Sequence, residues 1–266
     1  MKSRIYWTFI AVTLSAILIF IFSPIFARER SLLSRKIYNR YQVQISLQKE
    51  LGYVVDFPLE KLDLYPMMIT YNDDGLSYEL GKEVSFTVEY SFADFKKGHG
   101  YSSIFLPDDP LYNAYIGSYS ILGFGQPLSE TDLTGVSRYD MINLALPALG
   151  LIGPDAAFDV LDSGSYKEDH YISGHSFSVY ERTVVTNGAE HASDDFHADD
   201  LLYGSGPEPT VSFPIRVMKG RIYHHYFEEI DLNLALFTLG KSEDTLQDFE
   251  EIIINHVRIE FHNEKD

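Results

Sequence analysis

The 266-residue sequence contains no cysteine and a single tryptophan, Trp7. The absence of cysteine excludes a disulfide framework, a cysteine-ligated zinc or iron–sulfur site, a thiol nucleophile and the acylated cysteine of a lipoprotein. Glycine and proline are also modest, at 18 and 11 residues, which excludes a collagen-like chain. The apolar share of 45% is that of an ordinary globular protein with enough material for a packed core.

Basic residues are few relative to acidic ones, with 21 Lys and Arg against 39 Asp and Glu. The first 40 residues hold seven of the basic side chains and one of the acidic ones, so residues 41–266 carry a net charge of −24. Such a body repels the phosphate backbone that Lys and Arg must neutralise in nucleic-acid complexes. The charge argues against nucleic acid as a partner and permits divalent cations, basic proteins and neutral glycans.

One long apolar run stands near the N-terminus, where residues 5–27 contain no Asp, Glu, Lys or Arg. At about 1.5 Å per helical residue, this segment is long enough to cross the roughly 30 Å hydrocarbon layer of a membrane. We predict an uncleaved transmembrane anchor preceded by a short cytoplasmic start, residues 1–4. The alternative is a cleaved signal peptide, but Ala27 follows Phe26 and Ile25, which makes a poor cleavage site.

A helical stalk is predicted after this run, at residues 28–52. Residues 31–51 contain no Gly or Pro and place apolar residues at helical spacing, until Gly52 supplies a stop signal. Two basic side chains precede the apolar run and five follow it, which by the positive-inside rule favours a cytoplasmic body. The very short basic start that opens into the apolar run is instead typical of exported proteins. We expect a single-pass cell-membrane protein with its body outside the cytoplasm.

Residues 53–266 predict one acidic α+β domain, with a mainly antiparallel β-sheet and a few flanking helices. Residues 84–92 alternate apolar and polar side chains, as a half-buried antiparallel strand does. Further strands are predicted at residues 211–217, 230–236 and 257–261, with weaker patterns at residues 67–71, 113–122 and 177–185. Because strands and helices do not alternate regularly, the pattern argues against a doubly wound parallel sheet.

Turn and capping residues predict how these elements are connected. Lys219 and Gly220 predict the turn of a hairpin. Ser137 and Asp140 fit a capping box at the start of a helix. Three helices are predicted, at residues 138–146, at residues 154–161 and from an N-cap at Asp244 onward.

The densest polar cluster is residues 191–200, with two imidazoles and four carboxylates. Zinc and manganese accept mixed His and Asp ligands, and hard cations prefer carboxylate oxygens. The candidate metal ligands are His191, Asp194, Asp195, His197 and Asp199, and a divalent metal there would support a metal-dependent hydrolase. The alternative is an exposed acidic loop with solvated carboxylates, since no EF-hand or zinc-site spacing is present. No other cofactor is predicted.

Aromatic residues suggest a second kind of site, because the chain has 19 Tyr and 18 Phe. His99 lies between two glycines, which let a ligand approach the backbone closely. Tyr101 follows it, and Tyr112 and Tyr115 lie in a stretch that begins with two aspartates. We predict His99, Tyr101, Tyr112 and Tyr115 as binding residues, for a protein or a cell-wall glycan. The alternative is that these rings pack in a half-buried sheet.

Two short motifs resemble catalytic signatures without the context that these require. Residues 174–178 resemble a nucleophile elbow around Ser176, but β-formers follow where a helix is needed. Residues 235–242 match a phosphate-binding loop except for Ala235 in place of the first glycine, and their apolar residues are typical of a strand. We predict no catalytic role for either motif.

The leading hypothesis is therefore a membrane-anchored extracytoplasmic binding or interaction module without a catalytic motif. A metal-dependent hydrolase using residues 191–200 is the second hypothesis, and an anchored glycan binder is the third.

Overall fold

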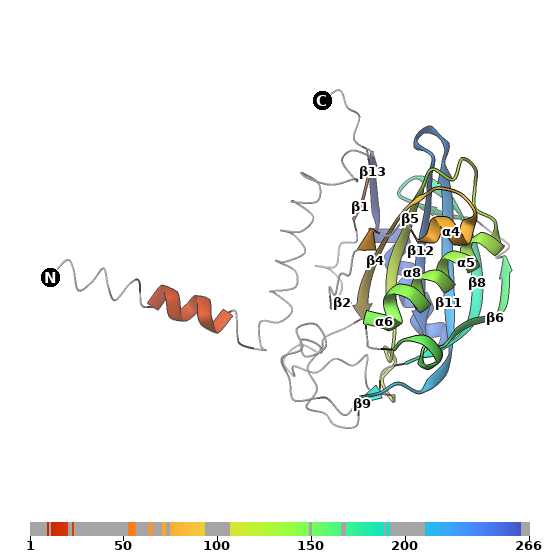
Figure 1. Cartoon of the computed structure of the whole chain (residues 1–266). Coiled ribbons are helices and arrows are strands. Elements are labelled where there is room, and N and C mark those ends of the chain that lie inside the picture. Colours follow the sequence, from red (N-terminus) through yellow and green to blue (C-terminus); the bar gives the residue numbers. More distant parts are fainter. Residues whose placement is uncertain are drawn as a thin grey trace.

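The computed structural model describes residues 10, 12–20, 23, 53–56, 64–65, 71–72, 75–93, 107–148, 151–165, 169–188, 190–191 and 211–261. Near the N-terminus, residues 12–20 are helical (Figure 1). Within the described ranges, no helix has both the length and the apolar character that a membrane crossing requires. The stalk predicted at residues 28–52 lies outside these ranges.

The body is built on an antiparallel sheet, as predicted, with nine strands in the described part of the chain. Its main path runs β2 (Leu64–Tyr65), β4 (Ser85–Ala93), β5 (Tyr115–Leu122), β12 (Leu232–Gly240), β11 (Ile215–Phe227), β8 (His175–Asn187) and β6 (Phe158–Ser165). Two short strands flank this path, β3 (Tyr71–Asn72) beside β4 and β7 (His170–Ile172) beside β8. Two separate pairs are β1 (Tyr53–Asp56) with β13 (Arg258–Phe261) and β9 (Glu190–His191) with β10 (Val211–Ser212).

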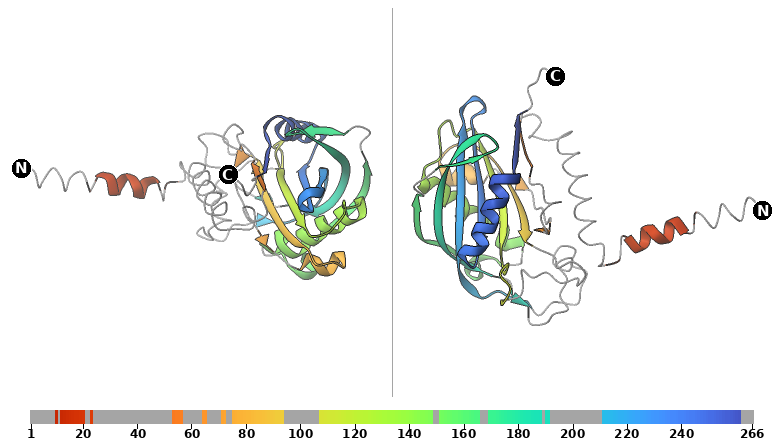
Figure 2. Two further views of the ribbon diagram at one scale, coloured as in Figure 1. Left: turned by 90° about the horizontal axis from the view of Figure 1, so that it is seen from above. Right: turned by 180° about the vertical axis from the view of Figure 1, so that it is seen from behind.

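Helices cover both faces of the sheet, and the fold is α+β because the strands are antiparallel and do not alternate regularly with helices. Helix α5 (Glu130–Asp140) lies in front of the sheet in Figure 1, and α8 (Glu243–His256) lies in front when the molecule is seen from behind (Figure 2). A π-helix, η3 (Met141–Ala145), and the short α6 (Leu146–Ala148) continue α5. The remaining short helices are α4 (Leu76–Leu80), η4 (Gly153–Asp155) and η5 (Glu228–Ile230).

Strand β12 lies at the centre of the fold, and all nine of its residues are buried. Because successive strand residues point to opposite faces, β12 supplies two cores. Leu234 and Leu236 pack in one core with Phe249 and Ile253 of α8. On the other face, Phe237 packs in the second core, which includes Leu133 and Val136 of α5. The sheet is therefore a layer between two helical layers, and both of its faces contribute apolar contacts.

The predicted hairpin turn at Lys219 and Gly220 is wrong. Both residues lie inside the 13-residue strand β11, where Lys219 pairs with Gly240 and Gly220 with Leu239 of β12. The chain turns instead at η5, where Asp231 adopts a left-handed backbone with φ of 49°. Aspartate tolerates this conformation better than most residues, so the turn forms without glycine.

The predicted helix boundaries also need correction. Helix α5 begins at Glu130, eight residues before the prediction, with Ser129 as N-cap in a capping box with Asp132. Ser137 lies inside this helix, where its hydroxyl donates to the Leu133 carbonyl at 2.9 Å. Ser242, not Asp244, caps α8.

The helix predicted at residues 154–161 is also wrong. A single 3₁₀ turn, Gly153–Asp155, is followed directly by β6. Proline near the start of η4 suits the first turn of a helix, but the residues beyond it pair with β8.

Candidate functional site

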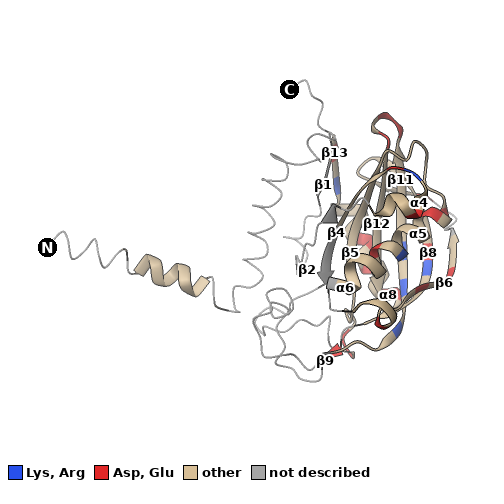
Figure 3. Ribbon diagram, viewed as in Figure 1, with Lys and Arg blue, Asp and Glu red and all other residues tan. Residues whose placement is uncertain are grey.

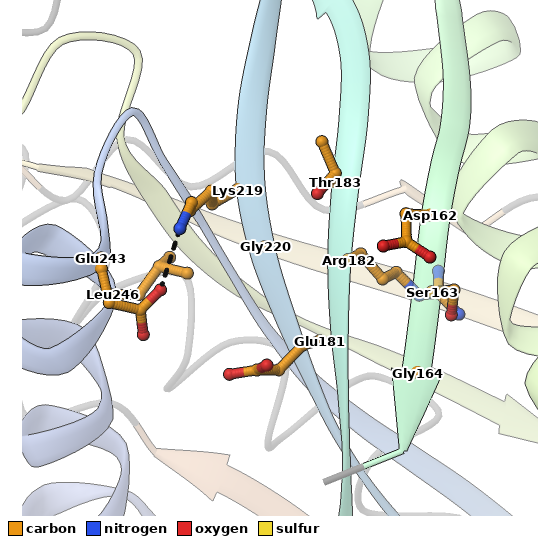
Figure 4. A pocket seen from close by; sticks show the side chains of 10 residues that line it. All are labelled: Asp162, Ser163, Gly164, Glu181, Arg182, Thr183, Lys219, Gly220, Glu243 and Leu246. Atoms are coloured by element: carbon orange, nitrogen blue, oxygen red, sulfur yellow. Dashed lines mark hydrogen bonds and ion pairs between the residues drawn. The ribbon is translucent and has the colours of Figure 1, made fainter.

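A cavity of about 230 Å³ lies where α8 begins beside β11, β8 and β6 (Figure 4). We refer to it as the α8 pocket. It opens to solvent and carries mainly polar groups. Its lining residues are Asp162, Ser163, Gly164, Glu181, Arg182, Thr183, Lys219, Gly220, Glu243 and Leu246.

Strand register places these side chains together. Lys219 of β11 lies opposite Thr183 of β8, which in turn lies opposite Asp162 of β6. A bulge between Val160 and Asp162 shifts the register of β6, so the Asp162 side chain falls in line with this row. Alternation along β8 turns Arg182 to the opposite face, and Figure 4 shows its side chain running behind β6.

Arg221 lies beside the pocket and binds the carboxylates on its acidic side. Its side chain is only 5% exposed and forms ion pairs with three carboxylates, those of Glu181 at 3.1 Å, Glu243 and Glu250. Burial lowers the pKa of Arg221, but the surrounding negative groups outweigh burial and raise it above its usual range. The guanidinium therefore stays charged and fixes carboxylates from α8 and β8 around itself.

The charges around the pocket do not balance. Of the two basic residues that line the pocket, Arg182 turns its side chain to the other face of the sheet, and Lys219 contacts Glu243 at 3.5 Å (Figure 4). Acidic and basic segments adjoin along β8 (Figure 3). Two negative charges remain in excess when His170 is neutral, because four carboxylates face two cations: Asp162, Glu181, Glu243 and Glu250 against Lys219 and Arg221.

Of the predicted binding residues, Tyr112 and Tyr115 are described, and neither presents an open ring face. Tyr112 is 4% exposed. Tyr115 packs edge-on against Phe237 with ring centroids 6.0 Å apart, and its hydroxyl contacts the Met141 sulfur at 3.3 Å. His99 and Tyr101 lie outside the described residues, so their role stays a prediction.

The predicted metal ligands are largely outside the described ranges. Asp194, Asp195, His197 and Asp199 are not described, and for His191 only the backbone pairing with Val211 is. Within the described ranges, no cluster of three or more His, Asp or Glu side chains is arranged to hold a metal ion. Metal binding by residues 191–200 stays a prediction.

The two motifs that resemble catalytic signatures, residues 174–178 and 235–242, have structural roles. The Ser176 hydroxyl donates to Asp169 at 3.0 Å, whereas the His225 imidazole contacts the Ser176 backbone carbonyl at 2.8 Å. Among the described residues, no imidazole is hydrogen-bonded to this hydroxyl, as a serine nucleophile would require. Residues 235–240 belong to β12, so they form a strand where a phosphate-binding loop would be needed.

His224 and His225 point to opposite faces of β11, as the strand pattern indicates. His224 is 6% exposed, and its Nε2 lies 2.9 Å from Oδ1 of Asn233. The Asn233 amide also accepts from Leu128 N at 2.8 Å and donates to the Gln126 carbonyl at 3.0 Å. This network joins the loop before α5 to the central strand.

His224 should make the protein less stable as the pH falls below about 6.5, the ordinary histidine pKa. Burial lowers the pKa of His224 in the folded protein. In this pH range the unfolded chain therefore binds more protons than the folded protein, and a falling pH favours unfolding. This histidine can remove up to about 1.4 kcal/mol of unfolding free energy per pH unit in that range.

His224→Gln keeps a partner for Asn233 but cannot titrate. Urea unfolding followed by circular dichroism should show a shallower loss of stability between pH 6.5 and 5 for His224→Gln than for the parent. Identical pH dependence in both proteins would contradict a role for His224.

The α8 pocket was not identified from the sequence. One local signal points to it, because Glu243 and Glu250 are seven residues apart and therefore lie on one side of α8. Their partner Arg221 lies on a strand that the sequence pattern divides into two. Comparisons with models of protein families, with curated proteins and with solved structures give no match to this chain.

Proposed function

We propose that the protein is a non-catalytic interaction module whose α8 pocket takes a cationic side chain, lysine or arginine, of a partner protein. The observation that carries this proposal is the excess of carboxylates at an open cavity, because Asp162, Glu181, Glu243 and the adjacent Glu250 outnumber Lys219 and Arg221. Its volume of about 230 Å³ is below the roughly 300–1,000 Å³ of pockets for drug-sized ligands. A single side chain matches that size better than a whole small molecule.

Preorganisation supports binding at this site. Arg221 holds Glu181 and Glu243 in place before any ligand arrives, so less side-chain entropy is lost on binding. Both carboxylates still retain exposure, with side chains 49% and 40% exposed, so they can accept further hydrogen bonds. Charge-assisted hydrogen bonds from a lysine or arginine to such carboxylates are stronger than neutral ones.

An apolar row beside the pocket favours a protein segment as the ligand. Ile215 and Val217 are 60% and 62% exposed. By strand alternation they share a face of β11 with Lys219, so they continue the pocket along the strand. Val217 pairs with Val185 of β8, which adds a second apolar side chain. A basic residue flanked by apolar residues would contact both parts of this surface.

The setting that we propose is the outer surface of a cell membrane. The apolar run at residues 5–27 would anchor the chain there, with residues 53–266 outside the cytoplasm. The net charge of −24 for residues 41–266 would attract basic partners over a longer range than the pocket itself. Membrane fractionation and protease treatment of intact cells test this setting, since a body protected until the membrane is broken would overturn it.

The binding proposal is tested with the full-length protein in detergent and fluorescently labelled peptides of sequence Gly-Val-X-Val-Gly. We expect the peptides with Lys or Arg at X to bind, those with Gln or Glu not to, and binding to weaken as salt is added. Glu181→Gln should lower affinity about tenfold, equivalent to about 1.4 kcal/mol. The measurement is fluorescence polarisation.

Glu79→Gln is the matched control, because Glu79 is an exposed residue of α4 and the charge change is the same. It should leave peptide affinity unchanged. Equal binding of the Lys and Gln peptides, or equal losses in Glu79→Gln and Glu181→Gln, would overturn the proposal.

A further inference from the structure

Two imidazoles, those of His175 and His225, lie beside each other where β8 begins and β11 ends. His224 pairs with Ser178, so His225 and Phe177 come next on the two strands and face the side of the sheet that α8 covers. His175 lies two residues before Phe177 and shares its face. The ring centres of His175 and His225 are 5.5 Å apart. The fold thus brings together two histidines that are 50 residues apart in the sequence.

The His225 ring has a fixed proton position. Its Nδ1 lies 2.8 Å from the backbone carbonyl oxygen of Ser176. Because a carbonyl oxygen can only accept, Nδ1 carries the hydrogen, and the neutral ring keeps its lone pair on Nε2. Histidines that bind metal ions usually donate their other N–H group to a carboxylate or a backbone carbonyl in the same way, which fixes the tautomer and the ring orientation. His225 is therefore held in a form that can bind a metal ion through Nε2.

The remaining ring nitrogens of the pair are open to solvent. Within the described structure, neither nitrogen of His175 nor the Nε2 of His225 has a hydrogen-bond partner. None of these three atoms is among the described buried polar atoms without a partner, so each has accessible surface. Burial and His225 lower the pKa of His175, against the effect of Glu229, so His175 is predominantly neutral at pH 7. An arriving cation therefore meets free lone pairs at these atoms.

The spacing of the two rings suits a shared ion. Two imidazoles on one tetrahedral ion, with metal–nitrogen distances of about 2.0–2.1 Å, have ring centres roughly 5 Å apart. The observed distance of 5.5 Å is close to this value, and the rings are inclined by 47° instead of stacked. His175 is partly exposed, so rotation of its side chain can close the remaining difference. Both imidazoles can therefore bind the same ion.

Phenylalanine rings surround the histidine pair. The Phe227 ring centre lies 4.9 Å from that of His175 and 4.4 Å from that of His225. Phe177 lies 5.3 Å from His225, and Phe261 of β13 lies 5.8 Å from His175. Phe177 and Phe227 are buried, whereas Phe261 is 40% exposed and lies at the rim. Such an apolar shell restricts the movement of the imidazoles and the access of water, both of which favour a metal site.

We propose that His175 and His225 bind one divalent transition-metal ion of the class that prefers imidazole ligands, Cu²⁺ or Zn²⁺. The Nε2 of His225 and one nitrogen of His175 are the protein ligands, and water completes the coordination, since no third described His, Asp or Glu is arranged to join them. Cu²⁺ binds more tightly than Zn²⁺, and Mg²⁺ and Ca²⁺, which prefer oxygen ligands, do not bind. The site does not include residues 191–200 and does not depend on the proposed peptide-binding function.

The first test is electron paramagnetic resonance of the full-length protein in detergent at pH 7, with less than one equivalent of Cu²⁺. The spectrum should show two equatorial imidazole nitrogens. His175→Gln and His225→Gln should each lose this pattern. Each should also weaken Cu²⁺ binding by at least the roughly 10–100-fold that is typical of losing a second-shell partner. Circular dichroism checks that the variants fold.

His256→Gln is the matched control, because His256 is a partly exposed residue of α8 and the same kind of side chain is replaced. It should keep the affinity and the spectrum of the parent. If His175→Gln and His225→Gln bind Cu²⁺ as the parent does, the ion is held elsewhere, for example by residues 191–200, and the proposal is wrong.

Crystals soaked in a zinc salt give a direct reading that does not require any variant to fold. Anomalous scattering should place a zinc ion between the two imidazoles, about 2.0–2.1 Å from the Nε2 of His225. The absence of an ion between these rings, including the case in which zinc is found only at residues 191–200, would refute the proposal.

Discussion

Replacing Arg221 by methionine should lower the free energy of unfolding by about 3 kcal/mol, because it leaves three carboxylates together without their cation. Of these, Glu250 is the most buried, with a side chain 21% exposed. Glu181 and Glu243 are 49% and 40% exposed and regain some hydration, so the loss should fall at the lower end of the 3–5 kcal/mol typical of broken buried ion pairs. Urea unfolding followed by far-ultraviolet circular dichroism measures it.

The surface pair of Arg216 and Glu190 provides the control. Arg216 is 41% exposed, so Arg216→Met should cost less than about 1 kcal/mol. Adding Glu250→Gln to Arg221→Met should restore part of the lost stability, because it removes the most buried of the stranded charges. If Arg216→Met and Arg221→Met cost the same, or if Glu250→Gln lowers the stability of Arg221→Met further, the Arg221 cluster does not have the role described above.

The second large effect is expected for Phe249→Ala, which should cost about 3–5 kcal/mol. Phe249 of α8 is 1% exposed and lies in the core that α8 forms with the sheet. Removing the ring loses buried apolar area and leaves a cavity that neighbouring strands cannot fill, since β12 is fixed on both sides by hydrogen bonds. Urea unfolding at pH 7 measures the change.

Phe249→Leu and Tyr78→Ala are the controls for this prediction. Phe249→Leu keeps most of the buried volume and should cost much less than Phe249→Ala. Tyr78 of α4 is 91% exposed, so Tyr78→Ala should change stability by no more than about 0.5 kcal/mol. A cost below about 1 kcal/mol for Phe249→Ala would mean that α8 does not hold this core together.

Local patterns predicted the strands far better than the connections between them. Residues 84–92 alternate clearly, and β4 forms at Ser85–Ala93. Lys219 and Gly220 resemble a turn because glycine and a charged residue interrupt an apolar pattern, yet pairing on both sides holds them in β11. Tertiary pairing overrides turn preference here, and no window of a few residues contains that information.

The sequence pattern predicts the start of helix α5 too late in the chain for a related reason. Its sequence includes Gly135 and several polar residues, so its intrinsic preference for helix is weak. Leu133 and Val136 are fully buried against the sheet, and this packing stabilises the helix. The capping box of Ser129 and Asp132 can be recognised in the sequence. The residues that follow it do not repeat apolar side chains at helical spacing, so the pattern alone does not indicate a helix there.

The α8 pocket could not be predicted because its residues come from four elements. Asp162, Glu181, Lys219 and Glu243 are separated by 19, 38 and 24 residues along the chain. Sheet order brings them together, since β6, β8 and β11 are neighbours although other elements separate them in sequence. Only the spacing of Glu243 and Glu250 was visible locally. The pattern of consecutive residues therefore points to the acidic stretch at 191–200 instead.

The pairing of β1 with β13 has a consequence for biosynthesis. Tyr53 lies opposite Phe261, so the first described strand of the body meets its partner only after about 200 further residues have been made. At roughly 5–20 residues per second, translation takes about 10–40 s to supply that partner. Throughout this interval Tyr53 and Val55 lack the apolar neighbours supplied by α8 and β13. The nascent chain therefore carries an exposed, unpaired segment, where a ribosome-associated or translocon-associated chaperone would be most useful.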